Sequence, residues 1–301
     1  MFIQTVSQVV KLFLFMILGY ILAKKDILPK ESPKVLSKLL VWACCPALYF
    51  RTFASQFTPD KLSSSAITIL VSIISLFISY LIALLLGKVF IKDQYTRNVL
   101  TYSVCVPNYG YMGNVLILAL LGEAVLVEFQ IFVLPVTIFM ITIGYSLLLD
   151  RKANFKSLLN PMLIAAFAGI VLGLLRIPLP AFLLDALSGL SGCMGPVSMI
   201  LAGCVIATFD PKKILLLKDV YFIVAVRMLL MPALAFALGK LLNLPPKYFF
   251  LLVVFHCLPA GLNTVVYPST IGKDSSLGAG LAVISNLVAI ITVPLFFSFV
   301  S

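Results

Sequence analysis

The chain has 301 residues, of which 62% are hydrophobic and 11% are charged, and its formal net charge is +11. Soluble domains carry about 25% charged residues, so this composition, with a mean hydropathy of +1.14, excludes a soluble enzyme and indicates an integral membrane protein. The basic residues lie in short loops between apolar runs, a pattern typical of membrane topology rather than of nucleic-acid binding.

Ten apolar stretches are expected to cross the bilayer as α-helices, since each has about the 20 residues that a spanning helix needs. The first carries Lys11 and lacks a preceding basic segment, so it is expected to be a retained helix and not a cleaved signal. The sequence therefore predicts an all-α membrane protein with spans at residues 3–23, 34–54, 64–90, 97–121, 126–149, 158–175, 180–208, 220–242, 248–271 and 275–300.

The loop charges predict an orientation. Ten spans place both termini on one side, and the loops then alternate between the two faces. Fourteen lysines and arginines fall in the loops of one face, among them Arg151, Lys152 and Lys156, against five on the other. Positive loops face the cytoplasm, so both termini are expected outside it, with the protein in the cytoplasmic (inner or plasma) membrane.

Ten spans also allow two five-helix halves, 1–156 and 157–301, of opposite orientation, an arrangement common in secondary transporters. Matching positions support such an inverted repeat: Gly19 with Gly169, Pro46 with Pro196, and Pro107 with Pro259. The alternative is coincidence among 17 prolines and 17 glycines.

The fourth and ninth spans both contain Pro, Gly and Asn near their middle. Proline removes a backbone donor and glycine permits unwound geometry, so each span is expected to break into two half-helices. Such breaks are tolerated at membrane depth only where protein or a water-filled cavity receives them. The residues concerned are Pro107, Asn108, Tyr109, Gly110, Gly113 and Asn114 in the fourth span, and Pro259, Gly261, Asn263 and Thr264 in the ninth.

The start of a half-helix presents free N–H groups and a positive dipole end, which favour an anion. Asn108 and Asn263 add neutral amide donors. The sequence therefore predicts that a substrate is bound by Pro107, Asn108, Tyr109, Asn114, Pro259, Asn263 and Thr264. The glycines of the breaks, Gly110, Gly113 and Gly261, and the matched prolines Pro46 and Pro196 are predicted to support that site. The alternative is a pair of packed proline kinks with satisfied asparagines.

Other polar residues within spans are predicted to support this site. Arg227 is expected to brace carbonyl ends or to attract a carboxylate, and His256 to be a core histidine or a protonatable group. No carboxylate lies deep within a span, which disfavours a carboxylate proton relay, while sodium coupling through Thr264, Ser285 or Asn286 stays open. The cysteines all fall in apolar runs, so no metal site or other cofactor is expected.

Several segments together carry a family likeness, namely 18–22, 45–48, 107–113, 121–123, 227–232, 258–260 and 286–294. In their order and spacing the chain resembles, over nearly its whole length, the auxin efflux carrier family, which includes PIN-type auxin carriers and bacterial malate and malonate carriers. Pro107 and Asn108 match the crossover of that family's fourth span and Pro259 that of the ninth. Asn114 departs from the family, which more often has an apolar residue there.

The resemblance implies two inverted five-helix repeats, as in sodium/bile-acid symporters, with spans 4 and 9 broken and crossing. Spans 1, 2, 6 and 7 would form a scaffold and homodimer interface, and spans 3–5 and 8–10 a mobile transport domain. The expected function is elevator-type transport of a small organic anion, either a mono- or dicarboxylate or an auxin-like aromatic acid. A sodium-coupled carrier, a channel and a sensor are the alternatives. An enzyme is not expected, because HExxH and GxSxG motifs are absent from the sequence.

Overall fold

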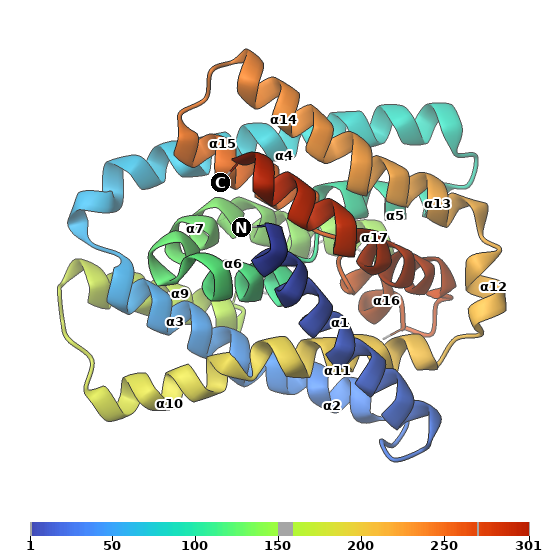
Figure 1. The fold of residues 1–301 in the computed structure, drawn as a ribbon, viewed down its shortest axis with the longest axis horizontal. Helices are drawn as coiled ribbons and strands as arrows, with labels where there is room; N and C mark the ends of the chain where they lie inside the picture. Colours follow the sequence, from blue (N-terminus) through green and yellow to red (C-terminus); the bar gives the residue numbers. More distant parts are fainter. Residues whose placement is uncertain (1, 150–158, 270, 301) are drawn as a thin grey trace.

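The computed structural model describes residues 2–149, 159–269 and 271–300, and these are arranged as packed α-helices (Figure 1). The predicted boundary between the halves at 156/157, the predicted start of the sixth span at Leu158 and the basic residues Arg151, Lys152 and Lys156 lie outside this range. The first half forms α1 (Phe2–Lys24), α2 (Ser32–Leu39), α3 (Cys45–Gln56), α4 (Leu62–Phe90), α5 (Gln94–Cys105), α6 (Asn114–Leu121), α7 (Glu123–Phe139) and α8 (Tyr145–Leu149).

The second half continues in the same manner. It forms α9 (Pro161–Leu174), α10 (Ala181–Gly192), α11 (Met194–Ala207), α12 (Pro211–Leu215), α13 (Lys218–Ala225), α14 (Met231–Leu241), α15 (Pro246–Cys257), α16 (Asn263–Ser269) and α17 (Ser276–Val300). Six helical stretches are long and apolar enough to cross a membrane: Phe2–Lys24, Pro59–Phe90, Glu123–Leu149, Ala181–Ala207, Lys218–Leu241 and Ser276–Val300.

Short π-helical turns join several of these helices into longer ones. The turns η1 (Leu40–Cys44), η4 (Met140–Gly144) and η6 (Val226–Leu230) connect α2 to α3, α7 to α8 and α13 to α14, while a 3₁₀ turn, η2 (Pro59–Lys61), leads into α4. Pro46 and Pro232 each lie two residues beyond a π turn. The extra residue of a π turn relieves the clash between a proline ring and the preceding turn, so these helices continue past their prolines.

The surface of α4 identifies the surrounding medium as apolar. Its buried face carries small residues at helical spacing: Ser65, Thr68, Ser72, Ser75, Ser79, Ala83 and Gly87. Its outer face exposes large apolar side chains such as Ile67, Leu70, Ile74 and Phe77. A helix with small polar residues inside and large apolar ones outside is stable in lipid and not in water.

Two helix pairs pack with closely approaching backbones. Helix α1 runs along α11 and α3 runs along α9. A Cβ atom added at Gly203 would collide with the backbone of Met16 and Tyr20, and one at Gly173 with the backbone of Phe57. Figure 1 shows α4 and α13–α14 along one edge, α2–α3 and α10–α11 along the opposite edge, and α5, α6 and α7 between them.

Candidate functional site

The predicted breaks in the fourth and ninth spans are present, and they meet. Helix α5 ends at Cys105, and a π-helical turn, η3 (Tyr109–Gly113), starts the second half-helix. Helix α15 ends at Cys257, and α16 starts at Asn263. The extended segments between them cross as an isolated antiparallel bridge from Pro107 to Ala260. Proline cannot donate a backbone hydrogen bond, so each break occurs where the helical ladder is already interrupted.

Backbone and side-chain hydrogen bonds hold the crossing together. The Asn108 N–H donates to the Pro259 carbonyl at 2.8 Å. The Ala260 N–H donates to Ser285 Oγ on α17 at 3.1 Å. Because backbone polar groups away from water require partners, these bonds allow unwound chain to persist in the interior.

Arg227 joins the carbonyl ends of the two first half-helices. Its side chain is fully buried, and Nε, Nη1 and Nη2 donate to the carbonyls of Leu258, Val104 and Phe255 at 3.0, 2.9 and 2.8 Å. Helix C-termini carry partial negative charge and unpaired carbonyls, which a guanidinium fork can satisfy together. These contacts make Arg227 a brace that links α5 to α15.

The opposite ends of the crossing offer free donors. No hydrogen bond among the described residues takes the N–H of Gly110 or Tyr111 at the start of the Tyr109–Leu121 helix. Asn108, only 3% exposed, has its Nδ2 atom without a partner. A buried amide donor without an acceptor is rare in proteins and calls for a ligand or water.

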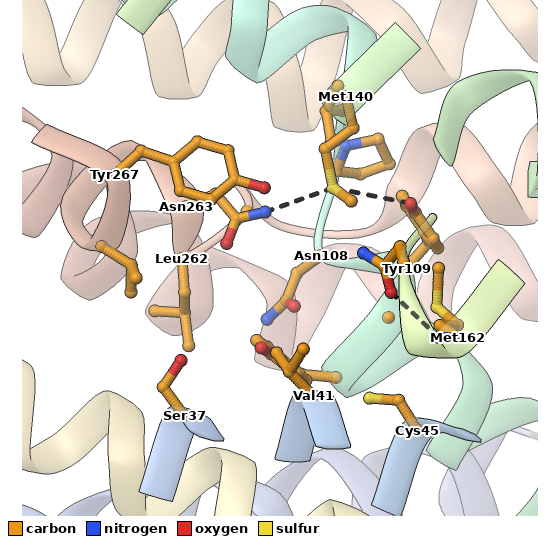
Figure 2. Close-up of a pocket in the computed structure, with 17 residues that line it drawn as sticks. Ser37, Val41, Cys45, Asn108, Tyr109, Met140, Met162, Leu262, Asn263 and Tyr267 are labelled. Carbon is orange, nitrogen blue, oxygen red and sulfur yellow. Dashed lines mark hydrogen bonds between the residues drawn. The ribbon is translucent and has the colours of Figure 1, made fainter. Parts of the chain in front are cut away.

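The residues that carry these donors, Asn108, Gly110 and Tyr111, line a cavity of about 130 Å³. An engineered protein cavity of about 150 Å³ holds benzene, so this volume suits a small organic molecule. Figure 2 shows the Asn108 amide directed toward Val41 of η1, with Met140 above Asn263 and Tyr109. The lining residues are Ser37, Val41, Cys45, Val106, Pro107, Asn108, Tyr109, Gly110, Tyr111, Met140, Asn160, Met162, Gly261, Leu262, Asn263, Val266 and Tyr267.

Several predicted site residues lie outside that lining. Asn114 donates to the Gly110 carbonyl and to Tyr49, and Thr264 Oγ1 donates to the Gly261 carbonyl at 2.9 Å. Both side chains therefore support the backbone at the breaks. The predicted residues that do not line the cavity are Asn114, Pro259, Thr264, Gly113, Pro46, Pro196, Arg227, His256 and Asn286.

His256 and Asn286 belong to other parts of the interior. His256 Nε2 is 2.9 Å from Ser75 Oγ and lines a separate, largely apolar cavity between α4 and α14. Asn286 Nδ2 donates to the Ala282 carbonyl within α17 at 2.7 Å. Pro46 and Pro196 lie in the first turns of α3 and α11.

The cavity also contains residues that the sequence analysis missed. Ser37, Val41 and Cys45 come from α2, η1 and α3, Asn160 and Met162 from the start of α9, and Met140 from η4. The Asn-Pro pair at 160–161 signals a helix start. No local pattern, however, indicates that these residues meet the crossing.

An apolar helical bundle with two broken helices beside a cavity is an architecture found in multi-pass membrane transport proteins. A family model described as "Membrane transport protein" matches residues 4–158 and 147–297. The chain is also 26% identical to "Uncharacterized transporter MJ1031" of Methanocaldococcus jannaschii, over 96% of each chain. The chain belongs to this membrane transport family, that of the auxin efflux carriers, and it is a transporter and not an enzyme.

Proposed function

We propose that the protein is a secondary carrier that moves a small organic anion, a mono- or dicarboxylate or an auxin-like aromatic acid, and binds it in the cavity at the crossing. The observation that carries this proposal is the unpartnered, buried Asn108 Nδ2 beside the free N–H groups of Gly110 and Tyr111. Donors without acceptors, at the positive end of a 13-residue helix, favour a negatively charged ligand.

The same lining disfavours a cationic substrate. None of the described residues that surround the cavity is charged. A cation would require carboxylate or convergent carbonyl oxygens to replace its hydration shell. No carboxylate lies in the described lining, and the Asn108 amide and the N–H groups of Gly110 and Tyr111 are donors, which supports an anion over a cation.

The proposed architecture is ten spans in two inverted five-helix repeats. The packing of α1 on α11 and of α3 on α9 supports it. The first pair joins span 1 to span 7, and the second joins span 2 to span 6. If the two halves are related by a repeat, span 1 corresponds to span 6 and span 2 to span 7, so each pair is the counterpart of the other. A scaffold of spans 1, 2, 6 and 7 would also form a homodimer, and both termini would lie outside the cytoplasm.

The proposed mechanism is an elevator-type motion of spans 3–5 and 8–10 against the scaffold. The cavity favours it because its walls come from both groups of helices: Ser37, Val41 and Asn160 on one side, Asn108 and Asn263 on the other. A substrate held by the crossing would move with it and change which face of the membrane it can reach. The alternative form of this proposal is a sodium-coupled carrier, in which carbonyl and hydroxyl oxygens bind the sodium ion.

Asn108→Ala tests the site. Loss of a hydrogen bond to a charged group costs about 1.5–3 kcal/mol, which weakens binding about 10- to 150-fold. Carboxylate flux into proteoliposomes, together with the rise in unfolding temperature that a bound carboxylate causes, should fall accordingly. Asn243→Gly is a matched control, because Asn243 is exposed and has a φ of 46° that glycine accepts. Unchanged flux and binding in Asn108→Ala would refute the site.

A further inference from the structure

The donors around the cavity are all neutral. Besides the Asn108 amide, Asn263 Nδ2 faces Met140 Sδ at 3.2 Å. A thioether is a weak acceptor, so this amide can transfer to a ligand oxygen at little cost. Asn160, on the scaffold side, is the third asparagine in the lining. Three uncharged amides from three separate elements therefore surround the same space.

Asn160 has one half of its amide engaged and the other free. Its Oδ1 accepts the Met162 N–H at 2.9 Å and caps the N-terminus of α9. No hydrogen bond among the described residues uses its Nδ2. The cap fixes the side chain in place, because rotating the amide would cost the hydrogen bond that starts the helix. Nδ2 is thus held as a donor for a cavity ligand.

The rest of the lining sets how much charge the site accepts. Apart from these amides and the crossing backbone, the cavity wall consists of apolar side chains, among them Val41, Met140 and Leu262, and of the hydroxyl-bearing residues, which include Ser37, Tyr111 and Tyr267; none of these lining residues is charged. One carboxylate can replace its lost water with the amide and backbone donors. A second carboxylate on the same molecule would find no charged partner in the rest of this lining, and an ionised group taken out of water without one is strongly disfavoured.

Building on the proposed function, we propose that this carrier selects singly charged carboxylates whose remaining atoms are apolar and rejects dicarboxylates. In this proposal Asn160 Nδ2 is a substrate-binding donor that the scaffold contributes. The carboxylate lies between Asn108 and Asn160. The apolar body of the substrate lies against Val41, Met140 and Leu262. Charge, and not length, decides which acids enter.

Butyrate and succinate provide a matched pair of probes, since both have four carbons and differ by one carboxylate. Purified wild-type protein is heated with each acid, and the rise in unfolding temperature reports binding. Butyrate is expected to stabilise the protein, and succinate at neutral pH to bind at least tenfold more weakly. Uptake of the same two acids into proteoliposomes provides the second readout.

Two substitutions separate the cap from the donor at Asn160. Serine and aspartate cap helices about as well as asparagine, so Asn160→Ser and Asn160→Asp should match the wild-type unfolding temperature without ligand. Asn160→Ser removes Nδ2 and is expected to raise the butyrate dissociation constant about tenfold. Asn160→Asp adds a negative charge and is expected to abolish butyrate binding. Asn243→Gly is the control that changes neither.

Different results would overturn the charge selection, the role of Asn160 and the anion carrier. Equal binding of butyrate and succinate, or binding of succinate alone, would overturn the charge selection and leave the anion carrier standing. Wild-type butyrate affinity in both Asn160 variants would overturn the role of Asn160. Absence of stabilisation and uptake for every carboxylate would overturn the anion carrier itself, and the selection with it.

Discussion

Arg227 provides the strongest test of how the crossing is held. Its guanidinium bonds three carbonyls on two helices at 2.8 to 3.0 Å with no exposed surface. Each hydrogen bond from a charged donor contributes about 1.5–3 kcal/mol. A lysine ammonium is a single point with a flexible stem and cannot replace a planar fork. Arg227→Lys should therefore lose at least two bonds and destabilise the protein by about 3–6 kcal/mol.

Arg227→Met removes all three bonds together with the charge. Removing a charge from the apolar interior recovers a few kcal/mol of desolvation energy. The net loss for Arg227→Met is therefore expected to be about 2–4 kcal/mol, no larger than for Arg227→Lys. Because whole proteins are stable by only about 5–15 kcal/mol, both variants should also transport poorly.

The assay is thermal unfolding in detergent, followed by carboxylate flux in proteoliposomes. Arg176→Lys is the control, because Arg176 is 68% exposed and lies 3.8 Å from Asp60, a kind of ion pair worth less than about 1 kcal/mol. If positive charge alone held the half-helix ends, Arg227→Lys would match the wild type in both assays. That result would refute the reasoning from the shape of the guanidinium.

Two further predictions concern packing and pH. Gly203→Ala should lower the free energy of unfolding by about 1–3 kcal/mol, because the added Cβ would collide with the backbone of α1. Gly189 faces open space, so Gly189→Ala is the control and should not reduce stability. Equal unfolding temperatures for the two variants would contradict the close packing of α1 and α11. Asp93 caps α5, and the Thr96 N–H at 2.7 Å lowers the pKa of its carboxyl group. A carboxyl whose folded pKa lies below the unfolded value of about 3.9 stabilises the protein above that pH and loses this contribution as pH falls through the folded pKa. Asp93→Asn keeps a cap but has no carboxyl group to titrate. Its unfolding temperature should therefore fall less than that of the wild type between pH 6 and pH 3, a window set roughly by the carboxyl pKa. The same pH dependence in both proteins would contradict this role of Asp93.

Much of the fold is predictable from local chemistry. The six long apolar stretches follow from hydropathy, because a helix satisfies its own backbone in lipid. The two breaks follow from Pro107 and Pro259, because a missing N–H interrupts the helical ladder wherever it occurs. Asn108 could likewise be expected at the crossing, since it adjoins a break, and it lines the cavity there. The family assignment came from the order of these same segments and was confirmed by comparison.

Tertiary structure decided which polar residues share the cavity. Asn114, Thr264 and Asn286 look like site residues in sequence, yet their side chains bond nearby backbone within their own spans. Asn160 and Ser37 lie far along the chain from the crossing and line it only because α2 and α9 pack there. Local sequence determines where a helix starts, bends or breaks, because those energies come from neighbouring residues. Contacts between helices depend on the packing of whole surfaces, and only the folded chain shows which side chains meet.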